Sequence, residues 1–140
     1  MELESGGVLG LERARISSFL ATQRFGRSID VRAETVSTND DAREAADRGA
    51  PSGHVVVADA QTGGRGSRGR TWSSPAGVDL YLSIVERVAL SPTELPLVTL
   101  AVGLGVTDAI LALAPELAHV GAGVQLKWPN DAWIDRKKTA

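Results

Sequence analysis

The chain has 140 residues, of which 43% are hydrophobic and 23% are charged, a balance typical of a single soluble globular domain. Its 15 basic side chains do not outnumber its 17 acidic ones, so a general nucleic-acid binder is not favoured. The absence of cysteine excludes disulfides, thiolate metal sites and a cysteine nucleophile.

The N-terminal part of the chain predicts a helix and then a strand. Residues 11–25 have the spacing of an amphipathic helix, with Ile16 facing Phe19 and Leu20 at i+3 and i+4. Residues 28–36 alternate in polarity and are expected to form a strand. Residues 1–27 are therefore expected to be an N-terminal extension with one helix.

A second helix is predicted to begin at the segment Ser37-Thr38-Asn39-Asp40 and to continue to about Arg48. Ser37 and Asp40 have the spacing of a capping motif, and acidic residues are favourable at this end of a helix. Two interpretations of the segment are open and compatible. Ser37 or Thr38 caps the helix, or the polar side chains also receive a ligand at its N-terminus.

Residues 54–60 are short, apolar and β-branched, which predicts a strand buried on both faces. The stretch Gln61–Trp72 follows at once and contains four glycines and three arginines. Glycine lets a backbone approach a ligand closely, and arginine donates forked hydrogen bonds to phosphate or carboxylate. The stretch therefore predicts a site for a small anionic ligand.

The rest of the chain continues the mixed pattern. Residues 78–85 alternate as a strand, and residues 95–114 predict a long apolar helix with Thr93 as its N-cap. Asp108 and the lack of basic flanks favour a helix buried in a soluble core over a membrane span. Strands are predicted at 124–128 and 132–134, then a tight turn at Asp135-Arg136 and the start of another strand. These elements predict one α+β domain, with a mixed sheet and flanking helices, that is incomplete at its C-terminus.

The stretch at 61–72 is compatible with several ligand classes. Gly64, Gly66 and Gly69 match the spacing of the dinucleotide fingerprint, but the residues after Trp72 do not predict the helix that this fingerprint requires. No Walker lysine is present. An Arg-Gly segment that contacts RNA, with Trp72 stacked on a base, and a solvated loop without a ligand both stay open.

A second group of polar residues is Lys127-Trp128-Pro129-Asn130-Asp131. Its lysine and aspartate lie four residues apart around a proline turn, so both side chains can point into one cleft. Asp131 is a candidate magnesium ligand, and Asn130 can donate to phosphate or sugar. Together with the arginines, these are the residue types of nucleotide activation.

At these residues the chain resembles the catalytic domain of the biotin–protein ligases. The resemblance covers roughly residues 31–140, and three segments carry it in the family's order: 37–40, 64–72, and 127–131 followed by 136–140. It implies the biotin/lipoate ligase fold, which is like that of the class II aminoacyl-tRNA synthetases. The chain would be the N-terminal part of that domain, without an N-terminal DNA-binding domain.

The resemblance also implies a reaction. Biotin and ATP would form biotinyl-5′-AMP with Mg²⁺ assisting, and one lysine of a biotin carboxyl carrier domain would then accept biotin. Arg65, Lys138 and Asp131 are the expected catalytic residues, with Asp131 also the candidate Mg²⁺ ligand. The expected biotin and nucleotide contacts are Ser37, Thr38, Asn39, Gln61, Gly64, Arg65, Gly66, Ser67, Arg68, Gly69, Arg70, Trp72, Lys127, Asn130 and Lys138.

Further expectations follow from the same resemblance. The partner would be the carrier protein of acetyl-CoA carboxylase or a related carboxylase, the location would be cytoplasmic, and neither DNA nor membrane is an expected partner. The family usually has arginine where this chain has Ser67. Lipoate–protein ligase is the alternative enzyme, and the Arg-Gly RNA-binding module is the alternative outside enzymes. The 140 residues alone are expected to be weakly active or inactive.

Overall fold

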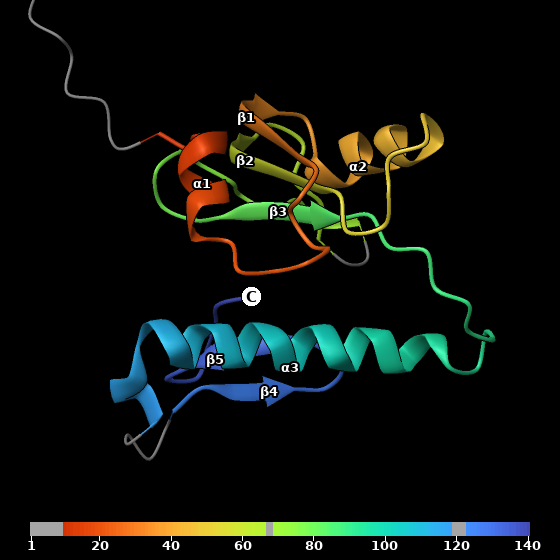
Figure 1. Cartoon of the computed structure of the whole chain (residues 1–140). Helices are drawn as coiled ribbons and strands as arrows, with labels where there is room; N and C mark the ends of the chain where they lie inside the picture. The colour runs from red at the N-terminus through yellow and green to blue at the C-terminus, as the bar shows by residue number, and fades with distance from the viewer. Residues whose placement is uncertain (1–9, 67–68, 119–122) are drawn as a thin grey trace, which may run out of the picture. The chain divides into compact units, whose positions relative to one another are not determined.

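The computed structural model describes residues 10–66, 69–118 and 123–140. It divides the chain into two compact units, Met1–Arg87 and Val88–Ala140 (Figure 1). The first unit contains α1 (Arg13–Phe19), β1 (Ile29–Thr35), α2 (Thr38–Asp47), β2 (Val55–Gln61) and β3 (Tyr81–Ile84).

The three strands of the first unit form one mixed sheet in the order β1-β2-β3. β1 and β2 are parallel and are joined by α2, whereas β3 pairs with β2 in the antiparallel sense. A parallel pair needs a crossover of this kind, and the predicted strand–helix–strand order supplies it. The predicted α+β class with a mixed sheet is therefore confirmed.

The core of the first unit lies where α2 packs on the central strand. Val56 of β2 is fully buried and contacts Ala42 of α2 and Val85, the residue after β3. The small side chains of α2 allow the helix to approach the sheet closely. This packing fixes the N-terminus of α2 relative to the ends of the strands.

Two elements of the first unit are shorter than predicted. The helix predicted over residues 11–25 ends at Phe19, whose side chain is 80% exposed. The strand predicted over residues 78–85 is regular only over β3. In both cases the hydrophobic pattern of the sequence extends beyond the residues that make regular backbone hydrogen bonds. This pattern indicates on which side of the chain the apolar side chains lie, and it does not indicate which backbone groups are paired.

The second unit contains α3 (Leu95–Leu113), the 3₁₀ helix η2 (Pro115–Ala118), β4 (Gln125–Lys127), β5 (Asp131–Ile134) and β6 (Lys137–Lys138). The strands form an antiparallel meander. The predicted turn between β5 and β6 is present, and both of its residues have positive φ: 47° at Asp135 and 64° at Arg136. Two such residues give the twist that a tight hairpin favours.

The helix α3 approaches its sheet at Gly103. A Cβ added there would lie 2.8 Å from Leu126 Cδ1 and 3.0 Å from the Cα of Asn130. Glycine is required for this approach, because any side chain would displace the backbone that carries Asn130. The packing of α3 therefore helps to set the position of a predicted site residue.

The expected burial of α3 is wrong for the described chain, in which Gly103 is the buried residue of this helix. Its main packing partners among the described residues are η2, β4 and β5, which cover one side, whereas its sequence is apolar all round. The predicted N-cap is also wrong, since Glu94 holds that position. By length and composition alone α3 could cross a membrane, which is weak evidence for a span.

The central packing contact can be tested by replacing Val56 with alanine. We expect the Val56→Ala variant to lose about 2 kcal/mol of unfolding free energy, from lost burial and the cavity that remains. Urea denaturation measures the change. Val78→Ala removes the same atoms from a side chain that is 66% exposed and should change stability by less than about 0.5 kcal/mol. Equal losses in the two variants would contradict the assigned core.

Candidate functional site

The candidate site lies where the two parallel strands end. Thr35 and Gln61, the last residues of β1 and β2, are partners in the register. β1 leads directly into the N-terminus of α2, and β2 leads into the glycine–arginine loop, which we define as residues 62–74. Sites in α/β sheets commonly lie outside the carboxyl ends of parallel strands, because the connecting loops meet there.

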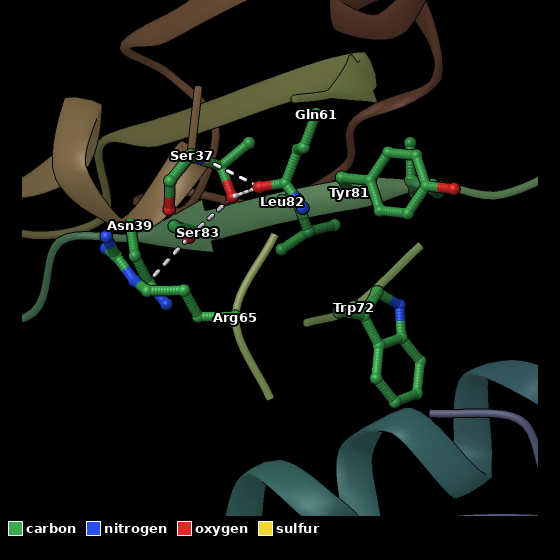
Figure 2. Close-up of a pocket in the computed structure, with 10 residues that line it drawn as sticks. Ser37, Asn39, Gln61, Arg65, Trp72, Tyr81, Leu82 and Ser83 are labelled. Atoms are coloured by element: carbon green, nitrogen blue, oxygen red, sulfur yellow. Dashed lines mark hydrogen bonds between the residues drawn. The ribbon is translucent and has the colours of Figure 1, made fainter. Parts of the chain in front are cut away.

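A pocket of about 330 Å³ opens at this edge (Figure 2). Four predicted residues from two distant segments line it together: Ser37, Thr38, Asn39 and Gln61. Two predicted residues of the glycine–arginine loop, Arg65 and Trp72, line it as well. Its volume is in the range of small-molecule sites.

Hydrogen bonds fix the polar wall of the pocket (Figure 2). Thr38 donates both its backbone N–H (2.9 Å) and its hydroxyl (3.1 Å) to Gln61 Oε1. Ser83 of β3 donates to Thr38 Oγ1 at 2.9 Å and approaches Asn39 Oδ1 at 3.1 Å. Gln61 Nε2 in turn donates to Ser74 Oγ at 3.2 Å. The wall is therefore a connected network from α2 through two strands to the loop.

The cap interpretation of the Ser37 segment needs a correction. Ser37 is the N-cap residue of α2, but its side chain makes no capping hydrogen bond. Its backbone carbonyl accepts from the N–H groups of Asp40 and Asp41, both at 3.1 Å. Thr38 is the first helical residue, and its hydroxyl is directed to Gln61. These side chains serve the pocket and not the helix end, which favours the ligand interpretation.

The glycine–arginine loop folds back on itself beside the pocket. Gly66 N–H donates to the Arg70 carbonyl (2.7 Å), and Trp72 N–H donates to the Gly64 carbonyl (2.8 Å). A Cβ at Gly64 would lie 2.6 Å from the Trp72 carbonyl oxygen, so only glycine allows this closure. A second hollow lies within the loop and is lined by Thr62, Gly63, Gly64, Arg65, Gly66, Gly69, Arg70 and Thr71.

Arg65 connects the loop to α2. Its Nη2 lies 2.5 Å from Asp40 Oδ1, and Arg65 lines both the pocket and the loop hollow. The hydrogen bond from Arg65 holds the pKa of the Asp40 carboxyl below its usual value, and the same bond raises the pKa of Arg65. Two other predicted loop residues, Ser67 and Arg68, lie outside the described residues.

Sequence reasoning did not assign the β3 residues to the site. Leu80, Tyr81, Leu82 and Ser83 all line the pocket, and the Tyr81 hydroxyl donates to the Pro75 carbonyl at 3.2 Å. The available signal was the alternation of this strand, which places Tyr81 and Ser83 on the face opposite the leucines. Polar side chains on one face of a strand indicate either solvent or a site.

A separate cluster forms in the second unit. The predicted residues Asp131 and Lys138 meet across the β5–β6 hairpin, with Lys138 Nζ 2.8 Å from Asp131 Oδ1. The Lys127 ammonium lies over the ring of Trp133, 4.6 Å from its centroid. Asn130 is the last residue of the turn before β5, and its Cα lies next to Gly103. The third segment of the family resemblance, residues 127–131 and 136–140, therefore contributes to one compact group of charged and aromatic side chains.

The predicted magnesium role of Asp131 has limited support from the geometry. One of its oxygens is already paired with the Lys138 ammonium, and a cation at that oxygen would face a second cation. Within the described ranges, no three histidine or acidic side chains converge as metal ligands. The described residues therefore do not fit a resident metal site, although a carboxylate can still contact an ion carried by phosphates.

The arrangement has a definite chemical capacity. The pocket offers amide and hydroxyl groups to a neutral polar ligand, and it places a guanidinium beside the positive end of a helix, where an anion is favoured. One half of a ligand would be recognised by hydrogen bonds and the other by charge.

Comparison with known proteins identifies the family to which a chain with this pocket belongs. The model of the biotin/lipoate A/B protein ligase family matches residues 32–140. The chain therefore belongs to the biotin/lipoate A/B protein ligase family. It is 42% identical over 122 residues to a biotin–[acetyl-CoA-carboxylase] ligase of Mycobacterium tuberculosis, covering 86% of this chain and 45% of that protein. It is 35% identical over 129 residues to a bifunctional ligase/repressor of Bacillus spizizenii, covering 92% and 38%.

Solved structures give the same fold. A biotin protein ligase from Leishmania major in complex with biotinyl-5-AMP matches with a TM-score of 0.66 and 33% identity, over 80% of this chain and 49% of that one. One from Aquifex aeolicus in complex with biotin and ATP matches with a TM-score of 0.61 and 32% identity, over 80% and 44%. The expected fold is confirmed, and the chain spans less than half the length of these relatives.

The environment of Tyr81 predicts a delayed ionisation. Burial, and then the charge of Asp79, raise the pKa of the Tyr81 hydroxyl above 10.0, its ordinary value. We expect absorbance at 295 nm, taken as a difference from the Tyr81→Phe variant, to show a midpoint above pH 10. The unfolded chain loses this proton first, so stability falls as the pH rises through the unfolded pKa.

Asp79→Asn is the matched variant for this titration. It removes the charge next to Tyr81 and retains burial, which is the larger cause, so the midpoint should fall but stay raised. A midpoint at or below pH 10 in the unsubstituted protein would contradict the assigned environment of Tyr81.

Proposed function

We propose that this chain is the biotin-adenylating part of a biotin–protein ligase. In the first step the biotin carboxylate attacks the α-phosphorus of ATP, forming biotinyl-5′-AMP as the bond to pyrophosphate breaks. In the second step the amine of a carrier-domain lysine attacks the acyl carbon, AMP leaves and the amine loses a proton. The observation that carries this proposal is the polar pocket at the N-terminus of α2, bordered by Arg65, in a member of this family.

The proposal assigns biotin's uncharged ureido head and bicyclic ring to the polar wall of the pocket. Ser37, Thr38, Asn39 and Gln61 would surround the head. The support is that Gln61 and Thr38 are already oriented by mutual hydrogen bonds. A site whose polar groups are fixed before binding loses less entropy when the ligand arrives.

The glycine–arginine loop would then hold the tail of biotin and the nucleotide. Backbone groups of Gly64, Gly66 and Gly69 would approach the tail and phosphate, with Ser67 in the same run. Arg65, Arg68 and Arg70 would carry phosphate charge, and Trp72 would stack on adenine. The support is that Arg65 and Trp72 border the same pocket as the polar wall. Forked guanidinium donors suit the geometry of phosphate.

The charged cluster of the second unit would act on the reacting groups. Lys138 would contact the carboxylate and phosphate oxygens, where negative charge accumulates in the transition state. Asp131 would orient the acceptor lysine or contact a magnesium ion, and Lys127 and Asn130 would contact nucleotide. The support is the 2.8 Å pair between Lys138 and Asp131, which holds the lysine in one position.

The metal ion, the protein partner, the location and the domain bounds belong to the same proposal. Magnesium would be carried by the phosphates of ATP. The protein partner would be the biotin carboxyl carrier domain of acetyl-CoA carboxylase or a related carboxylase, and the location would be cytoplasmic. Residues 1–140 would be the N-terminal part of the catalytic domain, with residues 1–27 as an extension and helix.

The alternatives have less support. The family includes lipoate ligases, but the relatives described above are biotin ligases. Competition between biotin and lipoate in the exchange assay below separates the two. An Arg-Gly RNA-binding module needs its arginines exposed along a single strand, whereas Arg65 is paired with Asp40 beside the pocket.

The first test is biotin-dependent exchange of label between pyrophosphate and ATP, measured on the full-length protein that contains this chain. We expect exchange that saturates with biotin, because formation of the adenylate is reversible. Exchange should be absent without biotin and weak with lipoate. No exchange at saturating biotin and ATP would overturn the proposal.

The second test removes the proposed catalytic ammonium. We expect Lys138→Gln to lower the exchange rate by roughly 10²- to 10³-fold, the usual effect of losing one contact to developing charge. The matched control is Lys137→Gln, because neighbouring residues of a strand point to opposite faces. The control should stay within about twofold by the same reasoning, and equal losses would show that the cluster acts only through net charge.

A further inference from the structure

The contact between Arg65 and Asp40 joins two segments that are 25 residues apart in the sequence. Asp40 lies in the first turn of α2, and its Oδ1 lies 2.5 Å from Arg65 Nη2. Arg43, one turn further along the helix, lies 3.5 Å from the same oxygen. The carboxylate therefore faces two guanidinium groups, one from its own helix and one from the glycine–arginine loop.

The position of this contact matters because Arg65 borders the pocket. Figure 2 shows its side chain extending from the loop toward Asn39 at the N-terminal end of α2. A guanidinium has three nitrogens that donate in a fixed plane, and the contact with Asp40 engages one of them. Fixing one nitrogen of a planar group fixes the direction of the others. Asp40 thus sets how the guanidinium is presented to a ligand.

A purely helical role for Asp40 is the competing explanation. An acidic residue in a first turn stabilises the helix through its dipole, whatever else it contacts. Asp41 shares that turn and that charge, but its partners are the Thr35 hydroxyl at 2.8 Å and Arg32 at 3.9 Å, both in β1. Comparing substitutions of Asp40 and Asp41 therefore distinguishes an effect on the stability of α2 from an effect on the glycine–arginine loop.

The pair is ionised over the range in which a ligase would work. The pKa of Asp40 is lowered, first by the hydrogen bond from Arg65, with the nearby charges of Arg65 and Arg43 adding to it. A lowered carboxyl pKa means that the contact persists at neutral pH and is lost only as the pH falls through that lowered value. The contact between Asp40 and Arg65 is therefore formed before an anionic ligand arrives.

We propose that Asp40 is a positioning residue that fixes the Arg65 guanidinium for the anionic group of the bound ligand, the phosphate that joins the biotinyl and adenosyl parts. The inference rests on the proposed function. Arginine has a long side chain with much rotational freedom, and ordering it when the ligand binds would weaken affinity. Asp40 orders it beforehand.

The test is calorimetric binding of two ligands to the full-length protein. One is an analogue of biotinyl-AMP in which a non-hydrolysable, anionic sulfamoyl group replaces the phosphate, and the other is uncharged biotinamide. We expect Asp40→Asn to weaken the anionic analogue about 3- to 10-fold, the range for a partly exposed charged contact, and biotinamide by less than twofold. Asp40→Glu should restore part of the loss.

Two controls decide whether Asp40 acts through Arg65. Asp41→Asn removes the same helix-terminal charge and should leave both affinities within about twofold, while lowering the thermal midpoint as much as Asp40→Asn does. In an Arg65→Gln background, Asp40→Asn should cause no further loss, because the residue through which it acts is gone.

Several results would overturn the inference. These are equal effects of Asp40→Asn and Asp41→Asn, equal weakening of the charged and uncharged ligands, or a full additional loss in the Arg65→Gln background. If the unsubstituted protein binds neither ligand, the proposed function fails and the inference fails with it. If it binds both and Asp40→Asn has no selective effect, only the role of Asp40 is wrong.

Discussion

The site depends on one interaction, the pair of hydrogen bonds that Thr38 donates to the side-chain oxygen of Gln61. This contact joins the start of α2 to the end of β2, two positions that are 23 residues apart in the sequence. It therefore fixes these two segments relative to each other. Thr38 is 4% exposed, and polar groups buried to that extent need partners. A single amide therefore satisfies the helix end and defines the pocket wall, and the capping role predicted for the neighbouring Ser37 side chain is not needed.

The same constraint explains the glycines of the loop. Once Gln61 is held, the chain must return beside it within 13 residues, because the Gln61 N–H donates to the Ser74 carbonyl at 3.0 Å and the Gln61 side chain contacts Ser74 Oγ. A turn this compact brings the backbone of Gly64 against that of Trp72, at a distance that excludes a Cβ. Arg65 projects from this narrow segment, so its direction is set by the loop at its base and by Asp40 at its tip.

Much of the fold and part of the site could be predicted from the sequence, and the same physical reasons explain why the rest could not. The strands β1 and β2 and the helix α2 follow from periodicity and end signals, which are local properties. The glycine–arginine loop and the segment before α2 were expected to share a site from the family resemblance. The pairing of Arg65 with Asp40 and the pocket role of Ser83 could not be predicted, since both depend on how distant segments meet. The prediction that α3 is buried was wrong for the described residues, because an apolar sequence predicts that a helix packs against other elements but does not predict which ones.

The order of the contacts suggests why the two halves of a ligand would be held differently. An uncharged head can be recognised only by groups whose direction is fixed, and the network through Gln61, Thr38 and Ser83 fixes them by hydrogen bonds within the protein. A charged tail is attracted over a longer range, so its partner must supply a charge and also present it in a fixed direction. Arg65 meets that need from a loop and not from a strand. If Asp40 holds it in place, the Arg65 guanidinium already points to where the charge of the ligand will lie.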